Sequence, residues 1–127
     1  MAYTQLLNLN SFRVAVVEDD PLLCQILEDV LQDRGAVCAA FATADDALVA
    51  ILGSGQPDLL ITDHLVPGQL TGADLAQLLT SRWPSLPIII TTGYGYNIQS
   101  DLPSSVVYLQ KPWLPQVLED AITQALR

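Results

Sequence analysis

Basic residues are scarce in this 127-residue chain, which has 5 lysines and arginines against 14 aspartates and glutamates. The formal net charge is -9. A surface with so few cations cannot neutralise many phosphates, so direct binding to nucleic acid is not expected. A basic protein partner or a divalent cation suits such a surface better.

Cysteines and long apolar runs are also few. The two cysteines, Cys24 and Cys38, do not have the spacing of a metal-binding pair, and we expect two reduced, buried thiols. No apolar run approaches the roughly 20 residues of a membrane helix. The first residues lack the pattern of a secretory signal. These absences predict a cytoplasmic protein without membrane contact.

The residues that are abundant are hydrophobic: they make up 50% of the chain, whereas charged residues make up only 15%. This balance favours one globular domain over disorder. We expect a leader at 1–11 and a single domain at 12–127.

Short apolar segments alternate with segments of helical periodicity. Runs of this composition and length are typical of strands covered on both faces, and their alternation with helices predicts an open parallel α/β sheet. The five predicted strands are 13–17, 36–42, 58–62, 87–92 and 105–110.

Residues that favour helix starts precede the helical segments. Between Thr92 and Ser105, however, the sequence "GYGYNIQSDLPS" has little periodicity, so a fourth helix there should be short, irregular or absent. The start signals are Asp20 with Pro21, Thr43 with Asp46, Thr71 with Asp74, and Pro112 before a final amphipathic helix.

Polar residues follow the predicted strands at their carboxyl ends, where open parallel sheets bind ligands. Carboxylates that converge there repel one another unless a cation intervenes, and an oxygen-rich acidic cluster suits Mg²⁺. An aspartate beside Mg²⁺ and a lysine can attack a phosphoryl group, because the cations offset the repulsion of the phosphate. The residues concerned are Glu18, Asp19, Asp20, Asp63, Thr92 and Lys111.

Four motifs in this order resemble the receiver domain of bacterial two-component response regulators. They are "VVEDDP" (16–21), "LLITDHLVPGQLTG" (59–72), "IIITTG" (88–93) and "YLQKP" (108–112). The resemblance implies a flavodoxin-like, doubly wound, five-stranded parallel sheet of strand order 2-1-3-4-5 with helices on both faces. It also implies a signalling phosphoacceptor rather than an enzyme that turns over a substrate.

The same resemblance implies the roles of individual residues. Asp63 is the phosphoacceptor, and the metal ligands for Mg²⁺ are Glu18, Asp19, Asp63 and the backbone carbonyl of Leu65. The phosphoryl donor would be a sensor histidine kinase or a histidine phosphotransfer protein.

Three further residues receive roles from the resemblance. Thr92 is the switch hydroxyl, in preference to Thr91. Lys111 contacts the phosphoryl group, and its bond to Pro112 resembles a cis peptide of the family. Tyr108 occupies the position of a switch aromatic. By contrast, His64 should face away from the Asp63 side of the sheet.

The chain departs from the common family pattern in three places. The loop "PGQLTG" (67–72) is one residue longer and resembles receivers of hybrid sensor kinases. Leu65 stands where many members have a polar side chain, which predicts a long-lived aspartyl phosphate. The segment after Thr92 is shorter, which predicts that the common dimerisation mode is absent or modified, and leaves the oligomeric state open.

Two alternatives to a phosphorelay receiver remain. One is an aspartate-nucleophile phosphatase, although Leu65 occupies the position of its general acid. The other is a pseudo-receiver that binds partners without taking phosphate. A stand-alone receiver and a receiver excised from a hybrid histidine kinase are both compatible with the sequence.

Overall fold

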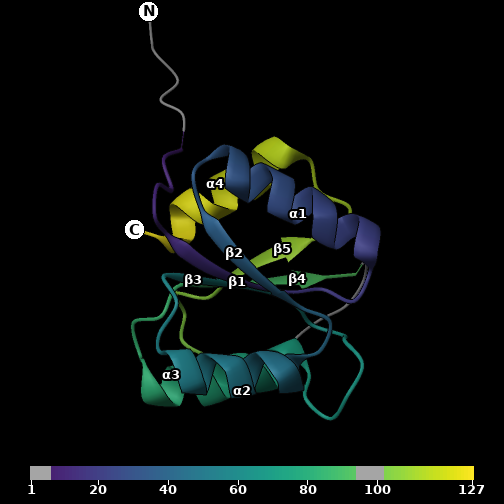
Figure 1. The fold of residues 1–127 in the computed structure, drawn as a ribbon, viewed down its shortest axis with the longest axis vertical. Coiled ribbons are helices and arrows are strands. Elements are labelled where there is room, and N and C mark those ends of the chain that lie inside the picture. The colour runs from purple at the N-terminus through teal and green to yellow at the C-terminus, as the bar shows by residue number, and fades with distance from the viewer. Residues whose placement is uncertain (1–6, 94–101) are drawn as a thin grey trace, which may run out of the picture.

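The computed structural model describes residues 7–93 and 102–127, which form one five-stranded sheet with helices on both faces (Figure 1). All neighbouring strands are parallel, as the sequence pattern predicts, and their order β2-β1-β3-β4-β5 is the one that the resemblance implies. The strands are β1 (Arg13–Val17), β2 (Val37–Phe41), β3 (Leu59–Asp63), β4 (Ile88–Thr92) and β5 (Val107–Gln110). The described helices are α1 (Pro21–Asp33), α2 (Ala44–Ser54), α3 (Gly72–Arg82) and α4 (Pro115–Ala125).

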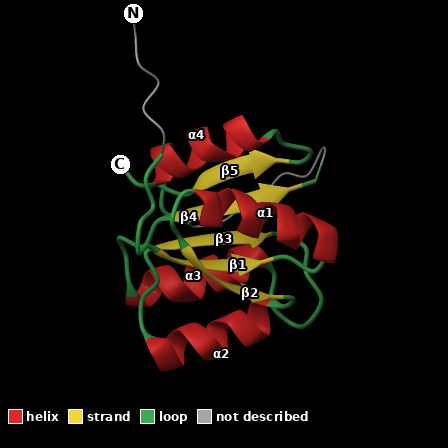
Figure 2. Ribbon diagram, turned by 45° about the horizontal axis from the view of Figure 1, so that its top comes forward, coloured by secondary structure: helices red, strands yellow, loops and turns green. Residues whose placement is uncertain are grey.

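The helices divide between the two faces of the sheet. Figure 2 shows α1 and α4 on one face and α2 and α3 on the other. Side chains alternate along each strand, so each face receives its own apolar layer. In β3, for example, Leu59 and Ile61 belong to the cluster beneath α1 and α4, whereas Leu60 belongs to the cluster beneath α2 and α3.

The central strand β3 and its neighbour β4 are buried at every residue. Their apolar runs explain this burial, because a central strand of a doubly wound sheet has no face in contact with water. Asp63 is the last residue of β3 rather than the first residue after it, so its backbone is fixed by the sheet. The nucleophile candidate therefore stands on a rigid element.

Strand β2 lies at the edge of the sheet and is more exposed than predicted. Its residues are half-buried or exposed, and Val37 is 63% exposed. The prediction of two covered faces is wrong here, because an edge strand has a neighbour on one side only.

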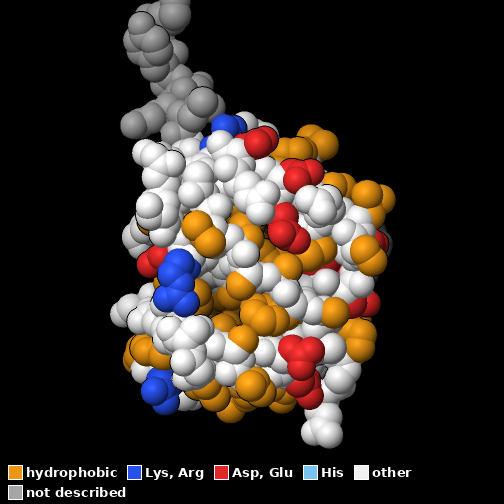
Figure 3. All heavy atoms as spheres, viewed as in Figure 1, with side chains coloured by type: hydrophobic (Ala, Val, Ile, Leu, Met, Phe, Trp, Pro, Cys, Tyr) orange, Lys and Arg blue, Asp and Glu red, His pale blue; other side chains and the backbone are white. Residues whose placement is uncertain are grey.

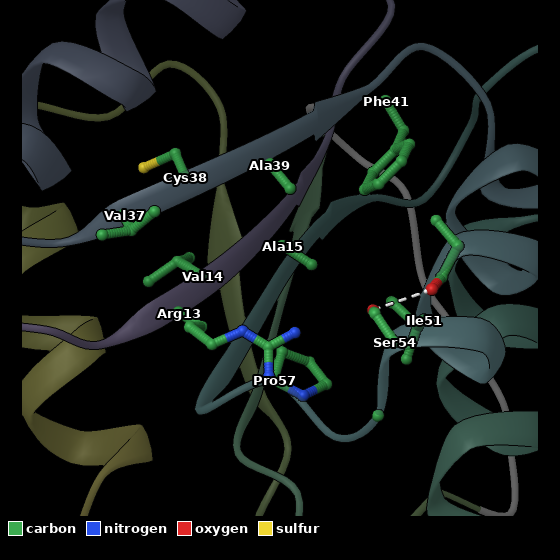
Figure 4. Close-up of a pocket in the computed structure, with 12 residues that line it drawn as sticks. Arg13, Val14, Ala15, Val37, Cys38, Ala39, Phe41, Ile51, Ser54 and Pro57 are labelled. Atoms are coloured by element: carbon green, nitrogen blue, oxygen red, sulfur yellow. Dashed lines mark hydrogen bonds between the residues drawn. The ribbon is translucent and has the colours of Figure 1, made fainter.

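A groove of about 100 Å³ opens between β2 and α2. Three alanines, Ala15, Ala39 and Ala50, are among the residues that line it, and their small side chains leave space that larger residues would fill. Figure 4 shows Ala15 and Ala39 on the two strands that border the groove. Figure 3 shows hydrophobic side chains around a hollow in this face of the molecule. None of the candidate site residues lines this groove.

The predicted helix starts are confirmed where the structure shows their hydrogen bonds. The Asp20 side chain accepts hydrogen bonds from the amides of Leu22 and Leu23, and Pro21 is the first residue of α1. Thr71 and Asp74 form a complete capping box at α3. The Thr43 hydroxyl accepts a hydrogen bond from the Asp46 amide at α2. Asp20 thus acts as a helix cap rather than as a member of the acidic cluster described below.

The amino-terminal segment joins the core at Leu9. This side chain is fully buried in the cluster beneath α1 and α4, and its amide donates to the Arg34 carbonyl at 2.8 Å. Leu9 belongs to the predicted leader at 1–11, so the end of that segment packs as part of the domain. The predicted irregular fourth helix and the predicted change of dimerisation surface fall largely on 94–101, outside the described residues.

Candidate functional site

The topology brings the candidate residues together at the carboxyl-terminal ends of the strands, which form one edge of the sheet. The strand order reverses between β1 and β3, and ligands of doubly wound sheets bind at such a reversal. Val17 pairs with Thr62, so the next residues lie at the ends of neighbouring strands: Glu18 directly follows β1, and Asp63 is the last residue of β3. Thr92 pairs with Gln110, which places Lys111 just beyond the same edge.

Three acids form a compact cluster at this edge. Glu18, Asp19 and Asp63 each contribute one carboxylate oxygen to a group whose atoms all lie within 4.8 Å of one another. Glu18 is 4% exposed and Asp63 is 9% exposed, whereas Asp19 is open to solvent. Burial raises the pKa of Glu18, although hydrogen bonds from the Asp20 amide and from Lys111 oppose the rise.

Lys111 supplies the positive charge of the cluster. Its Nζ donates to Asp63 Oδ2 at 2.8 Å and to Glu18 Oε1 at 3.0 Å. Burial acts to lower the pKa of Lys111, but the bonds to the two carboxylates outweigh it and the pKa is raised overall. The ammonium therefore stays charged at neutral pH and offsets part of the repulsion between the acids.

The backbone fixes Lys111 at the end of β5. Its amide donates to the Thr92 carbonyl at 2.7 Å, and the Lys111–Pro112 peptide is cis, as the resemblance implies. Thr92 is the last residue of β4 and is 8% exposed. Among the described residues, a Cβ on Gly93 would meet no atom within 4 Å.

The structure places the remaining predicted residues near the edge without testing their roles. Leu65 lies two residues beyond Asp63 with its side chain 57% exposed, and Tyr108 is 48% exposed on β5. The Leu65 carbonyl as a metal ligand and Tyr108 as a switch therefore stay predictions. His64 is buried, burial lowers the pKa of its imidazole, and it does not belong to the acidic ligand group found among the described residues.

Two residues important for the site were not predicted from the sequence. Gly72 packs so closely against β3 that a Cβ there would lie 2.2 Å from the Asp63 carbonyl oxygen. Asp45 accepts hydrogen bonds from amides of the loop that follows Asp63. The position of Gly72 at the end of a glycine-rich loop could have indicated a close approach of the backbone. No local feature of the sequence distinguishes Asp45 from Asp46.

The donor set fits a hard divalent cation such as Mg²⁺. Such ions take oxygen ligands, are held by one or two carboxylates and keep several waters. The cluster offers three carboxylate oxygens close together, one of them on an exposed residue that leaves room for solvent. Glu18, Asp19 and Asp63 are thus the side chains that could hold the ion.

Both cysteines are half-buried and free, rather than fully buried as predicted.

Within the part of the chain that the structure describes, no helix is long and apolar enough to span a bilayer.

Known proteins resemble this chain over most of its length. DNA-binding transcriptional regulator NtrC of Proteus hauseri is 35% identical over 116 residues, which cover 89% of this chain and 23% of that protein. Chemotaxis protein CheY of Pseudomonas aeruginosa is 29% identical over 115 residues, which cover 87% of this chain and 92% of that protein. The chain thus spans less than a quarter of the first relative and nearly all of the second.

Solved structures show the same fold. A putative response regulator from Chloroflexus aurantiacus has a TM-score of 0.78 at 28% identity, with 93% of this chain and 100% of that chain covered. A response regulator receiver protein from Sinorhizobium medicae has a TM-score of 0.80 at 21% identity, with 94% and 97% covered. The family model described as "Response regulator receiver domain" matches residues 14–123, a range that holds the acidic cluster, Thr92 and Lys111. This chain therefore belongs to the response regulator receiver domain family.

Proposed function

We propose that the chain is a phosphoacceptor that works in a cytoplasmic phosphorelay, with Asp63 as the residue that takes the phosphoryl group. The observation that carries the proposal is the ion-paired cluster at the edge of the sheet. There, Lys111 Nζ lies 2.8 Å from Asp63 Oδ2, and the carboxylates of Glu18 and Asp19 lie beside it. A structural ion pair would need only a single acid to neutralise Lys111, and this cluster has three. The arrangement therefore suits phosphoryl transfer better.

The proposed donor is a phosphohistidine of a sensor histidine kinase or of a histidine phosphotransfer protein. A carboxylate oxygen of Asp63 forms a new O–P bond while the P–N bond to the imidazole breaks. The electron pair of the broken bond stays on the imidazole nitrogen, which takes up a proton. Because Asp63 Oδ2 is held by Lys111, Oδ1 is the oxygen better placed to attack.

The residues around Asp63 have separate tasks in this proposal. Glu18 and Asp19, with Asp63 and the Leu65 carbonyl, would hold Mg²⁺. When bound, the ion supplies positive charge that offsets the repulsion between Asp63 and the incoming phosphate. Lys111 pairs with a phosphoryl oxygen.

Thr92 and Tyr108 would report the change to a partner. The hydroxyl of Thr92 donates a hydrogen bond to another phosphoryl oxygen, and Tyr108 responds to the movement of Thr92.

Exposed apolar side chains close in sequence to the site residues support a protein as the donor. Leu22 and Leu114 are each 71% exposed, and each follows a site residue by three positions, Asp19 and Lys111 respectively. Leu65 is 57% exposed and follows Asp63 by two. Apolar side chains grouped around a polar site are typical of a protein-docking surface. A sensor kinase or phosphotransfer protein would cover them while its histidine reaches Asp63.

Two alternatives remain open to the same test. A phosphatase would need a general acid near Asp63, and the exposed apolar side chain of Leu65 at the expected position disfavours it. A pseudo-receiver would bind partners without phosphate, which the intact cluster disfavours. The receiver could work as a stand-alone protein or within a hybrid histidine kinase.

The test is phosphorylation by acetyl phosphate, followed by intact mass. We expect one added phosphoryl group with Mg²⁺, none with a chelator, and none in Asp63→Asn. Continuous release of inorganic phosphate from a phosphomonoester would favour the phosphatase. No uptake from acetyl phosphate or from a phosphorylated histidine protein would favour the pseudo-receiver.

A further inference from the structure

Asp45, in the first turn of α2, reaches across to the loop between β3 and α3. Its Oδ1 accepts the Leu70 amide at 3.0 Å, and both carboxylate oxygens lie 3.2 Å from the Gln69 amide nitrogen. The partners are 24 and 25 positions away in the sequence. These contacts connect helix α2 to the loop that follows Asp63, the candidate phosphoacceptor.

The loop is shaped around this carboxylate. Gly68 has a φ of +101°, a conformation that disfavours other residues. A Cβ at Gly68 would lie 2.8 Å from Asp45 Oδ1, so a side chain there would force the carboxylate to shift. The two amides hold the pKa of Asp45 below its ordinary value, so the carboxylate is charged at neutral pH.

Asp45 is not needed to cap its own helix. The cap of α2 is Thr43, whose hydroxyl accepts the Asp46 amide. An acid in the first turn also interacts favourably with the helix dipole, but Asp46 provides the same charge in the same turn. The carboxylate of Asp45 is therefore committed to the loop.

The loop is fixed at two places, and Leu65 lies between them. At the strand, the His64 amide donates to the Thr91 carbonyl at 2.9 Å, and the Gly72 amide donates to the His64 carbonyl at 2.8 Å. At the far side, Asp45 holds Gln69 and Leu70. The path of residues 65–68 depends on both anchors.

We propose that Asp45 is a positioning residue of the cation site, which fixes the path of the loop and thereby the direction of the Leu65 carbonyl. This inference rests on the proposed function, since it assumes that Mg²⁺ binds at the acidic cluster. Residues that orient metal ligands without touching the metal typically change metal affinity by 10- to 100-fold when removed. Coupling is reciprocal, so Mg²⁺ should in turn stabilise the contacts of Asp45 with the loop.

The experiment compares Asp45→Ala with Asp46→Ala, a neighbouring acid of the same turn whose side chain makes no hydrogen bond to the loop among the described residues. Mg²⁺ affinity is measured by calorimetry, and amide hydrogen exchange is followed at Gln69 and Leu70. We expect Asp45→Ala to bind Mg²⁺ about tenfold more weakly, and Asp46→Ala to bind it like the wild type. In the wild type, Mg²⁺ should slow exchange at Gln69 and Leu70, and in Asp45→Ala it should not.

A second variant protects the test against a folding defect. Asp45→Asn keeps one acceptor oxygen and the size of the side chain, so it should lie between the wild type and Asp45→Ala in affinity. If Asp45→Ala speeds exchange at the loop but leaves Mg²⁺ affinity unchanged, Asp45 is only a structural contact and the inference is overturned. If the wild type itself binds no Mg²⁺, the proposed function fails, and the inference fails with it.

Discussion

At the scale of single residues, Lys111 determines whether three acids can share one edge of the sheet. Two of the acids are nearly buried, and their mutual repulsion would otherwise favour protonation. The two hydrogen bonds of Lys111 reach Glu18 and Asp63, but none is found to the exposed Asp19 in the described residues. The charge that Lys111 leaves uncompensated is what makes the cluster suitable for a divalent cation.

Leu65 provides a prediction about the lifetime of the phosphoryl group. Its exposed apolar side chain stands close to Asp63 and offers no hydrogen bond with which to hold an attacking water. We expect Leu65→Asn to shorten the half-life of the aspartyl phosphate several-fold. The decay is followed by loss of the phosphoryl mass after the donor is removed, with the exposed Leu78→Asn on α3 as the control. Slower decay in Leu65→Asn than in the parent would contradict the prediction.

The two cysteines provide a prediction about pH. Burial raises the pKa of both Cys24 and Cys38 to about 11 from an ordinary 9.0. At pH 8, the thiolate fraction should then be about a hundredfold below that of an ordinary thiol. Only the thiolate reacts with alkylating reagents, so the rate should fall with this fraction. We expect slow alkylation by iodoacetamide at pH 8 and a rate that climbs until pH reaches about 11.

The sign of the linked stability follows from the same shifts. Between pH 9.0 and about 11 the folded chain keeps thiol protons that the unfolded chain has lost. The contribution of the thiols to stability should therefore fall as pH rises through this window. Alkylation at pH 8 that is as fast in the native protein as in urea would contradict the assignment.

At the scale of elements, the start of α3 is packed against the end of β3. The Gly72 amide bonds to the His64 carbonyl, and the missing Cβ leaves room for the Asp63 carbonyl. Helix α3 thus begins beside the end of β3, and the capping box of Thr71 and Asp74 fixes that start. Asp63 is therefore held both by the sheet and by this junction.

Two glycine substitutions test this junction with opposite expected signs. Gly72→Ala places a Cβ 2.2 Å from a backbone oxygen, so we expect it to lower the free energy of unfolding by roughly 1–3 kcal/mol through overpacking. Gly53→Ala in α2 meets no atom within 4 Å, so we expect a gain of about 0.5–1 kcal/mol from helix propensity. Both values come from urea denaturation.

The same pair of variants shows whether the close contact at Gly72, rather than the replacement of a glycine as such, matters for phosphorylation. Phosphorylation should be slowed in Gly72→Ala and unchanged in Gly53→Ala. Equal effects of the two substitutions on stability would show that the close approach to Asp63 is not rigid.

At the scale of the whole molecule, much of the fold and site was predictable because local patterns and one topological rule suffice. Apolar runs locate the strands, Asp20 with Pro21 locates the start of α1, and the rule for parallel sheets brings Glu18, Asp63 and Lys111 together. Each of these inferences needs only neighbours in the sequence and the direction of the strands.

The features that were missed depend on packing between distant segments. Leu9 is buried by a core that its own surroundings in the sequence do not indicate. The exposure of β2 follows from its place at the edge of the sheet. Asp45 differs from Asp46 only in a contact with a loop 24 residues away. Single-sequence patterns do not encode such contacts.

The central claim is that Asp63 is the residue that accepts phosphate, and locating the acyl phosphate tests it most directly. The protein is treated with acetyl phosphate and Mg²⁺, reduced with borohydride, which converts an aspartyl phosphate to homoserine, and mapped by peptide mass spectrometry. We predict homoserine at position 63 and no reduction product in a sample that received a chelator. A reduction product at Asp19 or any other acid, or none in protein that has taken up phosphate, would contradict the account.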